Sequence, residues 1–114
     1  MIKTIKFNDA TVEVNWQSSK MRKKIVEIFD SAQKECEAVE SSLDELQLME
    51  KVESIYHDAF SSLFGKEKCD ELFPENSGID SYFEFIDLML QLKSEQDKSI
   101  DDYTKKFANI ANMK

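Results

Sequence analysis

The chain has 114 residues, of which 41% are hydrophobic and 33% are charged, and its formal net charge at pH 7 is −8. This length predicts one domain, residues 1–114, and the apolar content is sufficient for a core, which excludes an intrinsically disordered chain. The negative charge argues against binding to nucleic acid or to an anionic membrane surface, because both of these partners are negatively charged themselves.

Residues 2–16 alternate between apolar and polar side chains, as two short strands do. A two-residue loop at Asn8 and Asp9 places the apolar side chains of both strands on one face. The resulting pairs are Ile5 with Val12 and Phe7 with Ala10. We therefore expect an N-terminal β-hairpin, which either docks on the rest of the chain or adds to a strand of another subunit, because an isolated hairpin is marginally stable.

Residues 17–64 contain neither glycine nor proline, and such a long run favours helix. Ser18 or Ser19 is a suitable N-cap at its start. Ser42 followed by Glu45 fits a capping box, which predicts a break in the run beside Ser42. The apolar spacing continues through this point without a slip, so one long helix is the alternative.

Gly65 and Pro74 indicate two helix ends in close succession. From Ile79 to Leu92 the apolar residues cover most of a helix circumference, which is typical of a buried helix. We expect this helix to lie at the centre of the core. The side chains expected to meet there are Phe83, Ile86 and Leu90 together with Phe60, Phe64 and Phe73.

The polar segment from Lys93 to Lys98 interrupts the apolar pattern of the central helix. A narrow apolar stripe follows it, made of Ile100, Tyr103, Phe107 and Ile110. A stripe of this width suits contact with one other helix. The segment either binds a partner or packs back onto the chain as its closing helix. The whole chain is thus predicted to be mainly α, with four to five helices in a body of residues 17–114 behind a short N-terminal β-hairpin in residues 2–16.

A basic cluster lies in the first turns of the helix that begins near residue 18. Its members are Lys20, Arg22, Lys23 and Lys24. Positive charge at a helix N-terminus opposes the helix macrodipole, so these residues need another explanation. They are neutralised by the acidic remainder of the chain, or they contact an acidic partner or a neighbouring subunit.

The residue types that catalysis and metal binding require do not gather in the sequence. His57 has no second histidine and no cysteine at metal-ligand spacing, so we expect it on the surface or at a helix edge. Cys36 lies on an apolar stripe and Cys69 is expected to be partly exposed, and both are interpreted as reduced thiols. We expect no catalytic, cofactor-binding or metal-binding residues and no enzymatic activity.

Phe64 and Gly65 end a helix, the charged segment from Lys66 to Glu71 follows, and the pair Leu72-Phe73 precedes the apolar helix. In this order the residues resemble the C-terminal half of the tail assembly chaperones of siphophages and prophages. The resemblance covers roughly Ile55 to Leu92. It implies a non-enzymatic protein that binds the tape measure protein and keeps it soluble during tail assembly. It also implies a location in the cytoplasm of the bacterial host and no cofactor.

The alternative function is a small cytosolic helical adaptor, or a self-associating regulator, unrelated to phage. Both hypotheses need a partner-binding surface, and the candidates are the apolar stripe and the basic cluster. The partner is the tape measure protein by resemblance, and a homo-oligomer is the second hypothesis. No membrane partner is expected, because charged residues interrupt the longest apolar stretch and the N-terminus has no apolar core of the kind found in signal peptides.

Overall fold

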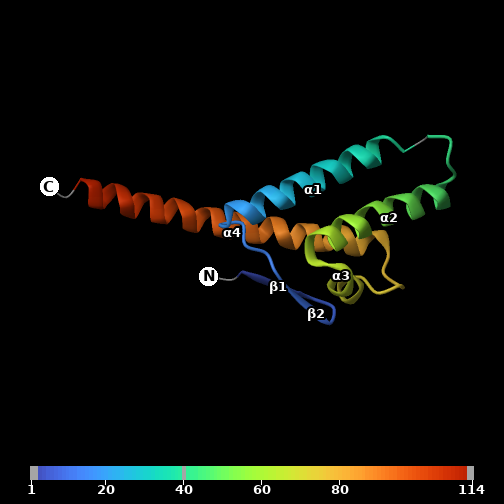
Figure 1. Cartoon of the computed structure of the whole chain (residues 1–114), viewed down its shortest axis with the longest axis horizontal. Helices are drawn as coiled ribbons and strands as arrows, with labels where there is room; N and C mark the ends of the chain where they lie inside the picture. Colours follow the sequence, from blue (N-terminus) through green and yellow to red (C-terminus); the bar gives the residue numbers. More distant parts are fainter. Residues whose placement is uncertain (1–2, 40, 113–114) are drawn as a thin grey trace.

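The structure is a computed structural model that describes residues 3–39 and 41–112. Its elements in chain order are β1 (Thr4–Phe7), β2 (Ala10–Glu13), α1 (Ser19–Glu37), α2 (Glu45–Phe64), α3 (Lys66–Leu72) and α4 (Ile79–Ala111). The prediction of a mainly α fold with a short N-terminal β-hairpin is confirmed, and the described residues contain four helices (Figure 1).

The hairpin has the predicted register, with Ile5 opposite Val12 and Phe7 opposite Ala10. Asn8 adopts φ 52° in the two-residue turn, a left-handed conformation that asparagine tolerates better than most residues. Its side-chain amide donates a hydrogen bond of 2.7 Å to the carbonyl oxygen of Leu72 at the end of α3. The hairpin therefore docks on the helices of its own chain, with Ile5, Ala10 and Val12 buried and Phe7 partly buried.

The expected break in residues 17–64 is present, since α1 ends at Glu37 and α2 begins at Glu45. The capping box, however, is formed by Asp44 and Gln47 and not by Ser42 and Glu45. The Asp44 carboxylate accepts a hydrogen bond of 2.8 Å from the backbone N–H of Gln47, whose side chain accepts one from Asp44. A carboxylate has the advantage over a hydroxyl here, because it places a negative charge at the positive end of the helix. Ser18 caps α1 as expected.

The core is a cluster of aromatic rings between α2, α3 and α4. Phe60 and Phe85 are fully buried, with ring centroids 5.3 Å apart in an edge-on arrangement. Phe73 packs against both of them, and Tyr82 lies 4.4 Å from Phe73. Gly65 makes this cluster possible, because its φ of 91° and ψ of 154° reverse the chain between α2 and α3 in a conformation that is nearly restricted to glycine.

The prediction for the central side chains of α4 was wrong for two of three residues. Ile86 is partly buried, but Phe83 is 44% exposed and Leu90 is 53% exposed. Phe60 and Phe73 are buried as expected, and Phe64 is partly buried. The reason is that α1 packs along α2 rather than along α4, so the side of α4 that carries Phe83 and Leu90 is left uncovered.

The polar segment Lys93 to Lys98 interrupts the apolar pattern but not the helix, because the central helix and the C-terminal segment form one continuous helix of 33 residues. Gln96, inside this segment, is fully buried. Its side-chain oxygen accepts a hydrogen bond from the backbone N–H of Trp16, and its side-chain nitrogen donates one of 3.0 Å to the carbonyl oxygen of Val14. A polar residue is needed at this position, because it forms hydrogen bonds with buried backbone groups of the segment that joins the hairpin to α1.

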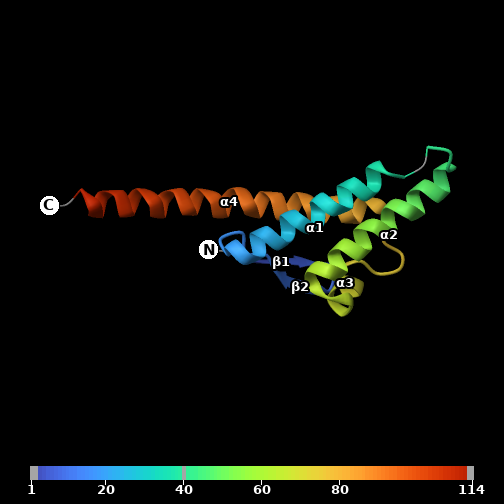
Figure 2. The ribbon, with the colours of Figure 1, turned by 45° about the horizontal axis from the view of Figure 1, so that its top comes forward.

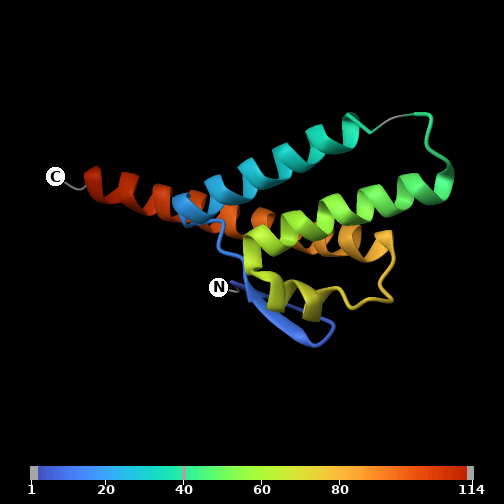
Figure 3. The ribbon, with the colours of Figure 1, turned by 45° about the vertical axis from the view of Figure 1, so that its right-hand side comes forward.

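The second half of α4 projects beyond the other elements in every view of the ribbon (Figures 1, 2 and 3). The molecule is correspondingly elongated, with principal extents of 67 × 31 × 19 Å. The hairpin and α2 lie against the first half of α4, and α3 packs on α2 and β2. The helix α1 diverges from α4 toward the loop that leads into α2 (Figure 1).

Candidate partner-binding surfaces

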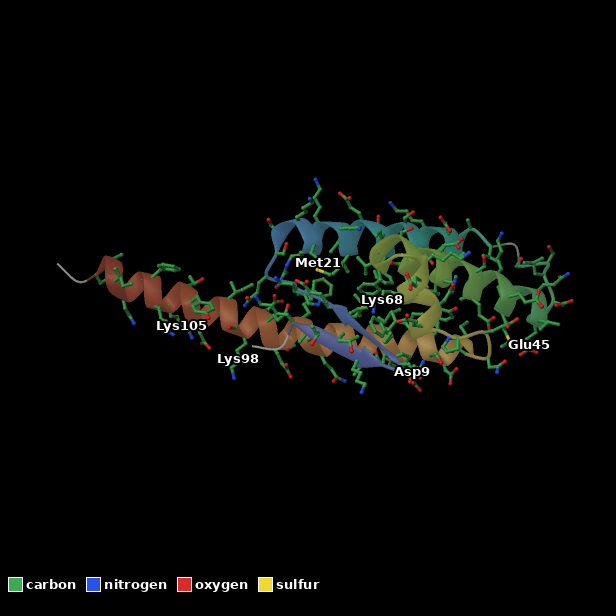
Figure 4. All side chains as sticks on the ribbon, turned by 60° about the horizontal axis from the view of Figure 1, so that its bottom comes forward. Asp9, Met21, Glu45, Lys68, Lys98 and Lys105 are labelled. Carbon is green, nitrogen blue, oxygen red and sulfur yellow. The ribbon has the colours of Figure 1, made fainter. Side chains whose placement is uncertain are left out.

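The apolar stripe predicted at the C-terminus is exposed on the projecting half of α4. Phe107 is 71% exposed and Ile110 is 64% exposed, and Tyr103 and Ile100 are exposed as well. Figure 4 shows the side chains around Lys98 and Lys105 with no other element opposite them. The segment does not pack back onto its own chain, so the closing-helix alternative is wrong. Whether the stripe binds a partner stays a prediction.

The stripe continues the buried face of α4. The buried residues on that face are Tyr82, Phe85, Met89, Leu92 and Gln96, and steps of three and four residues connect them. Ile100, Tyr103, Phe107 and Ile110 extend the same spacing. One face of a single helix therefore changes from covered to uncovered after Gln96, because the segment that joins the hairpin to α1 covers α4 at Gln96 and no described element lies against this face beyond it.

A second apolar surface, here called the α1/α4 groove, lies between α1 and the first half of α4. Val26 and Phe29 line it on α1, and Phe83, Ile86 and Leu90 line it on α4. Trp16 and Met89 contribute to its inner wall, and its volume is about 490 Å³. Val26 is 56% exposed, so both sides of the groove present apolar side chains to solvent. The dimensions and lining are those of a site for an apolar helix or a short apolar segment.

The four residues of the basic cluster have different surroundings in the structure. Arg22 turns inward, where its Nε donates a hydrogen bond of 2.8 Å to the carbonyl oxygen of Trp16 and its Nη2 pairs with Asp97. Lys23 pairs with Glu27 at 3.9 Å, one helical turn further along α1. These two members fit the neutralisation interpretation. Lys20 and Lys24 are exposed, which leaves them accessible to an acidic partner.

Asp97 holds one end of the α1/α4 groove together. It accepts hydrogen bonds from Lys93, one turn before it on α4, and from Arg22 of α1. These hydrogen bonds lower the pKa of the Asp97 carboxyl group from its ordinary value. Arg22 and Lys93 also lie over the ring of Trp16, at 5.8 and 5.9 Å from its centroid. Ion pairs thus connect α1 and α4 at one end of the groove, and the interior of the groove is apolar.

The structure assembles one polar cluster that the sequence analysis missed. Cys69 Sγ lies 3.6 Å from His57 Nδ1, and His57 Nε2 lies 3.2 Å from Asp70 Oδ1. The Tyr82 hydroxyl is 3.3 Å from the same Nδ1. His57 is partly buried at the α2 to α3 junction, and the expectation that Cys69 is partly exposed was wrong, because Cys69 is fully buried.

This cluster joins a thiol, an imidazole and a carboxylate, but its chemistry is that of a structural contact. Burial raises the pKa of the Cys69 thiol, which opposes formation of the nucleophilic thiolate. Burial likewise raises the pKa of Tyr82 to about 12. The sequence signal that locates the cluster is Gly65, since a reversal at this residue folds α3 back along α2 and brings position 69 toward position 57.

The described part of the chain holds two free thiols and no candidate metal site. No three histidine, cysteine or carboxylate side chains converge there in a way that could hold a metal ion. None of the helices in this part combines the length and the apolar character that crossing a bilayer requires. Cys36 is a half-buried free thiol, and burial raises its pKa as well.

A sequence profile for a family of unknown function (DUF6673) matches residues 8–113, nearly the whole chain. Neither the curated proteins nor the solved structures give a significant match.

Proposed function

This chain belongs to the family of unknown function DUF6673, and we propose that it is a phage tail assembly chaperone that binds the tape measure protein and keeps it soluble during tail assembly. The proposal includes a location in the cytoplasm of the bacterial host and a purely non-covalent mechanism without a cofactor. It rests on the resemblance carried by Phe64, Gly65 and the segment from Lys66 to Phe73. That segment forms the helix end, α3 and the turn before α4.

The observation that carries the proposal is the exposed stripe on the projecting half of α4. Helix-binding proteins offer apolar side chains at intervals of three and four residues to the apolar face of a partner helix, and the stripe has this spacing. The net charge of −8 opposes aggregation through this apolar surface, and so helps to keep the chain in solution. An apolar binding surface on a strongly charged body suits a protein that holds a hydrophobic client soluble.

The second candidate function is a helical adaptor or self-associating regulator without any connection to phage. The same exposed stripe supports it, since the stripe accepts any helix with matching apolar spacing. The genes beside this one separate the two functions. A tail chaperone gene is expected directly upstream of a very long tape measure gene, and another context favours the adaptor.

The direct test is co-expression with fragments of the tape measure protein encoded beside this gene. We expect the intact chain to co-purify with at least one fragment and to raise its soluble yield. Phe107→Glu should abolish both effects, because it places a charge in the middle of the stripe. Asn109→Glu is the matched control, since it adds the same charge on the opposite side of the same helical turn.

A chain ending at Ser99 completes the test. It lacks the stripe and keeps Gln96 and Asp97, so the body should stay folded while client binding is lost. Retention of tape measure fragments by Phe107→Glu or by the shortened chain would exclude the stripe as the client site. Absence of binding by the intact chain to every fragment would refute the chaperone function.

A further inference from the structure

We propose that two copies of this chain pair through antiparallel α4 helices, so that the stripe of each copy lies in the α1/α4 groove of the other. This pairing goes beyond the chaperone function, because it involves no client protein. In the absence of a client protein, it assigns one occupant, a second copy of this chain, to the stripe and to the groove.

The first argument is the spacing of the two surfaces along α4. The groove side carries Phe83, Ile86 and Leu90, and Lys93 follows beyond the groove lining, so the steps are three, four and three residues. Read in the reverse direction, the stripe carries Ile110, Phe107, Tyr103 and Ile100 at the same steps. Antiparallel helices therefore place Ile110 on Phe83, Phe107 on Ile86 and Tyr103 on Leu90. The last pair joins Ile100 to Lys93, whose aliphatic stem can cover an apolar side chain.

The second argument is symmetry. The groove side lies on the first half of α4 and the stripe on the second half, so this single register fills both grooves at once. Such an arrangement is a closed pair about a two-fold axis near Gln96 and Asp97, and two-fold pairs are the commonest oligomers. One stripe of four side chains makes a small contact. The closed pair contains this contact twice, which brings the buried area closer to the roughly 1,200 to 2,000 Å² that stable interfaces bury.

The third argument is charge. Asp102 and Lys106 lie four residues apart along one edge of the stripe, and Lys23 and Glu27 form an exposed ion pair with the same spacing on α1. The helix α1 runs antiparallel to α4, since Arg22 near its start meets Asp97 late in α4. A helix antiparallel to α4 is therefore parallel to α1. A partner helix in this direction carries Asp102 before Lys106 where α1 carries Lys23 before Glu27, so the charge order of the two helices is complementary and allows Asp102 to pair with Lys23.

These arguments favour a second copy over another protein as the occupant of the groove. The apolar spacing and the charge order are separate properties of the sequence, and both fit antiparallel α4 helices. Both halves of the contact are present on one chain. Pairing also covers the exposed side chains of Phe83, Leu90 and Phe107, which a chain in water would otherwise leave in contact with solvent.

The first experiment measures the mass of the purified full chain by sedimentation velocity over a range of concentrations, with no tape measure protein present. We expect a dimer that dissociates on dilution. Phe107→Glu in the stripe and Leu90→Glu in the groove should each give monomers, and both residues are exposed, so folding should be unaffected. Asn109→Glu should leave the dimer intact. A monomer at all concentrations, or a dimer that survives either of the first two substitutions, overturns the pairing.

The second experiment tests the register by disulfide formation in a Cys36→Ser background. Leu90→Cys chains mixed with Tyr103→Cys chains should form a crosslinked dimer under mild oxidation. Each variant alone should not, because two copies of the same position then lie roughly 20 Å apart along the paired helices at 1.5 Å per residue, and a disulfide needs about 7 Å or less between Cα atoms. Crosslinking of either variant with itself, or no crosslinking of the mixture, overturns the register.

The third experiment exchanges charges. Asp102→Lys and Lys23→Asp should each weaken the dimer, roughly two- to fivefold for each exposed pair, and the double variant should restore it. Failure of the double variant to recover would exclude the contact between α1 and the partner's α4. All three experiments omit the client, so a negative result leaves the chaperone proposal standing, and failure of client binding leaves the pairing intact.

Discussion

Two phenylalanines that lie two positions apart on α4 should differ widely in their contribution to stability. Phe85 is fully buried, and its ring lies 5.5 Å from Phe7, 5.3 Å from Phe60 and 5.7 Å from Phe73, measured between centroids. Phe83 is 44% exposed and packs edge-on against Tyr56 at 5.3 Å. Truncation of each to alanine removes the same atoms from the same helix, so the two variants isolate the effect of burial.

The expected magnitudes follow from these environments. Phe85→Ala leaves a cavity among aromatic rings and should lower the free energy of unfolding by roughly 3 to 5 kcal/mol. Complete burial of a phenylalanine side chain is worth roughly 1.5 to 3 kcal/mol, and Phe83 realises about half of it, so Phe83→Ala should cost about 1 kcal/mol. Small domains have about 5 to 15 kcal/mol in total, which makes the first change severe and the second mild.

Urea unfolding followed by circular dichroism measures both values. The two variants are best compared in the Phe107→Glu background, which prevents a second copy from stabilising the groove. We expect a difference between them of about 2 to 4 kcal/mol. Equal losses, or a larger loss for Phe83→Ala, would refute the assignment of Phe83 to the groove and of Phe85 to the core.

Three further changes test other parts of the fold. Gln96→Leu should lower the free energy of unfolding by about 2 kcal/mol or more, because it leaves the Trp16 N–H and the Val14 carbonyl without their partner, whereas the exposed Glu95→Leu should change little in the same urea titration. Gly65→Ala should lower the melting temperature through about 1 to 3 kcal/mol of backbone strain, since an added Cβ meets no atom within 4 Å and only the φ of 91° opposes it. The lowered pKa of Asp97 means that its contribution to stability is present above the ordinary carboxyl pKa of about 3.9 and is lost as the pH falls through the lowered value. Acid titration of Asp97→Asn should therefore show a smaller loss of stability than the unchanged chain below about pH 4, and an identical loss in both would contradict the assignment.

Local features of this protein could be predicted from the sequence because they depend on neighbouring residues. The two-residue turn at Asn8 and Asp9 set the hairpin register, since any slip moves Ile5 to the other face. The helix ends at Gly65 and before Pro74 follow from backbone restrictions of these two residues. The spacing of the stripe likewise predicted an apolar helix face, and the structure shows it exposed.

The tertiary structure decided which apolar faces are covered. The sequence indicates that the first half of α4 is apolar on most sides, but not that α1 packs along α2 and leaves Phe83 and Leu90 outside the core. The burial of Gln96 is of the same kind, because its partners lie about 80 positions earlier in the chain, as the separation between Gln96 and Trp16 shows. The pattern of apolar side chains indicates which faces of a helix can pack. The path of the rest of the chain determines which of those faces are covered.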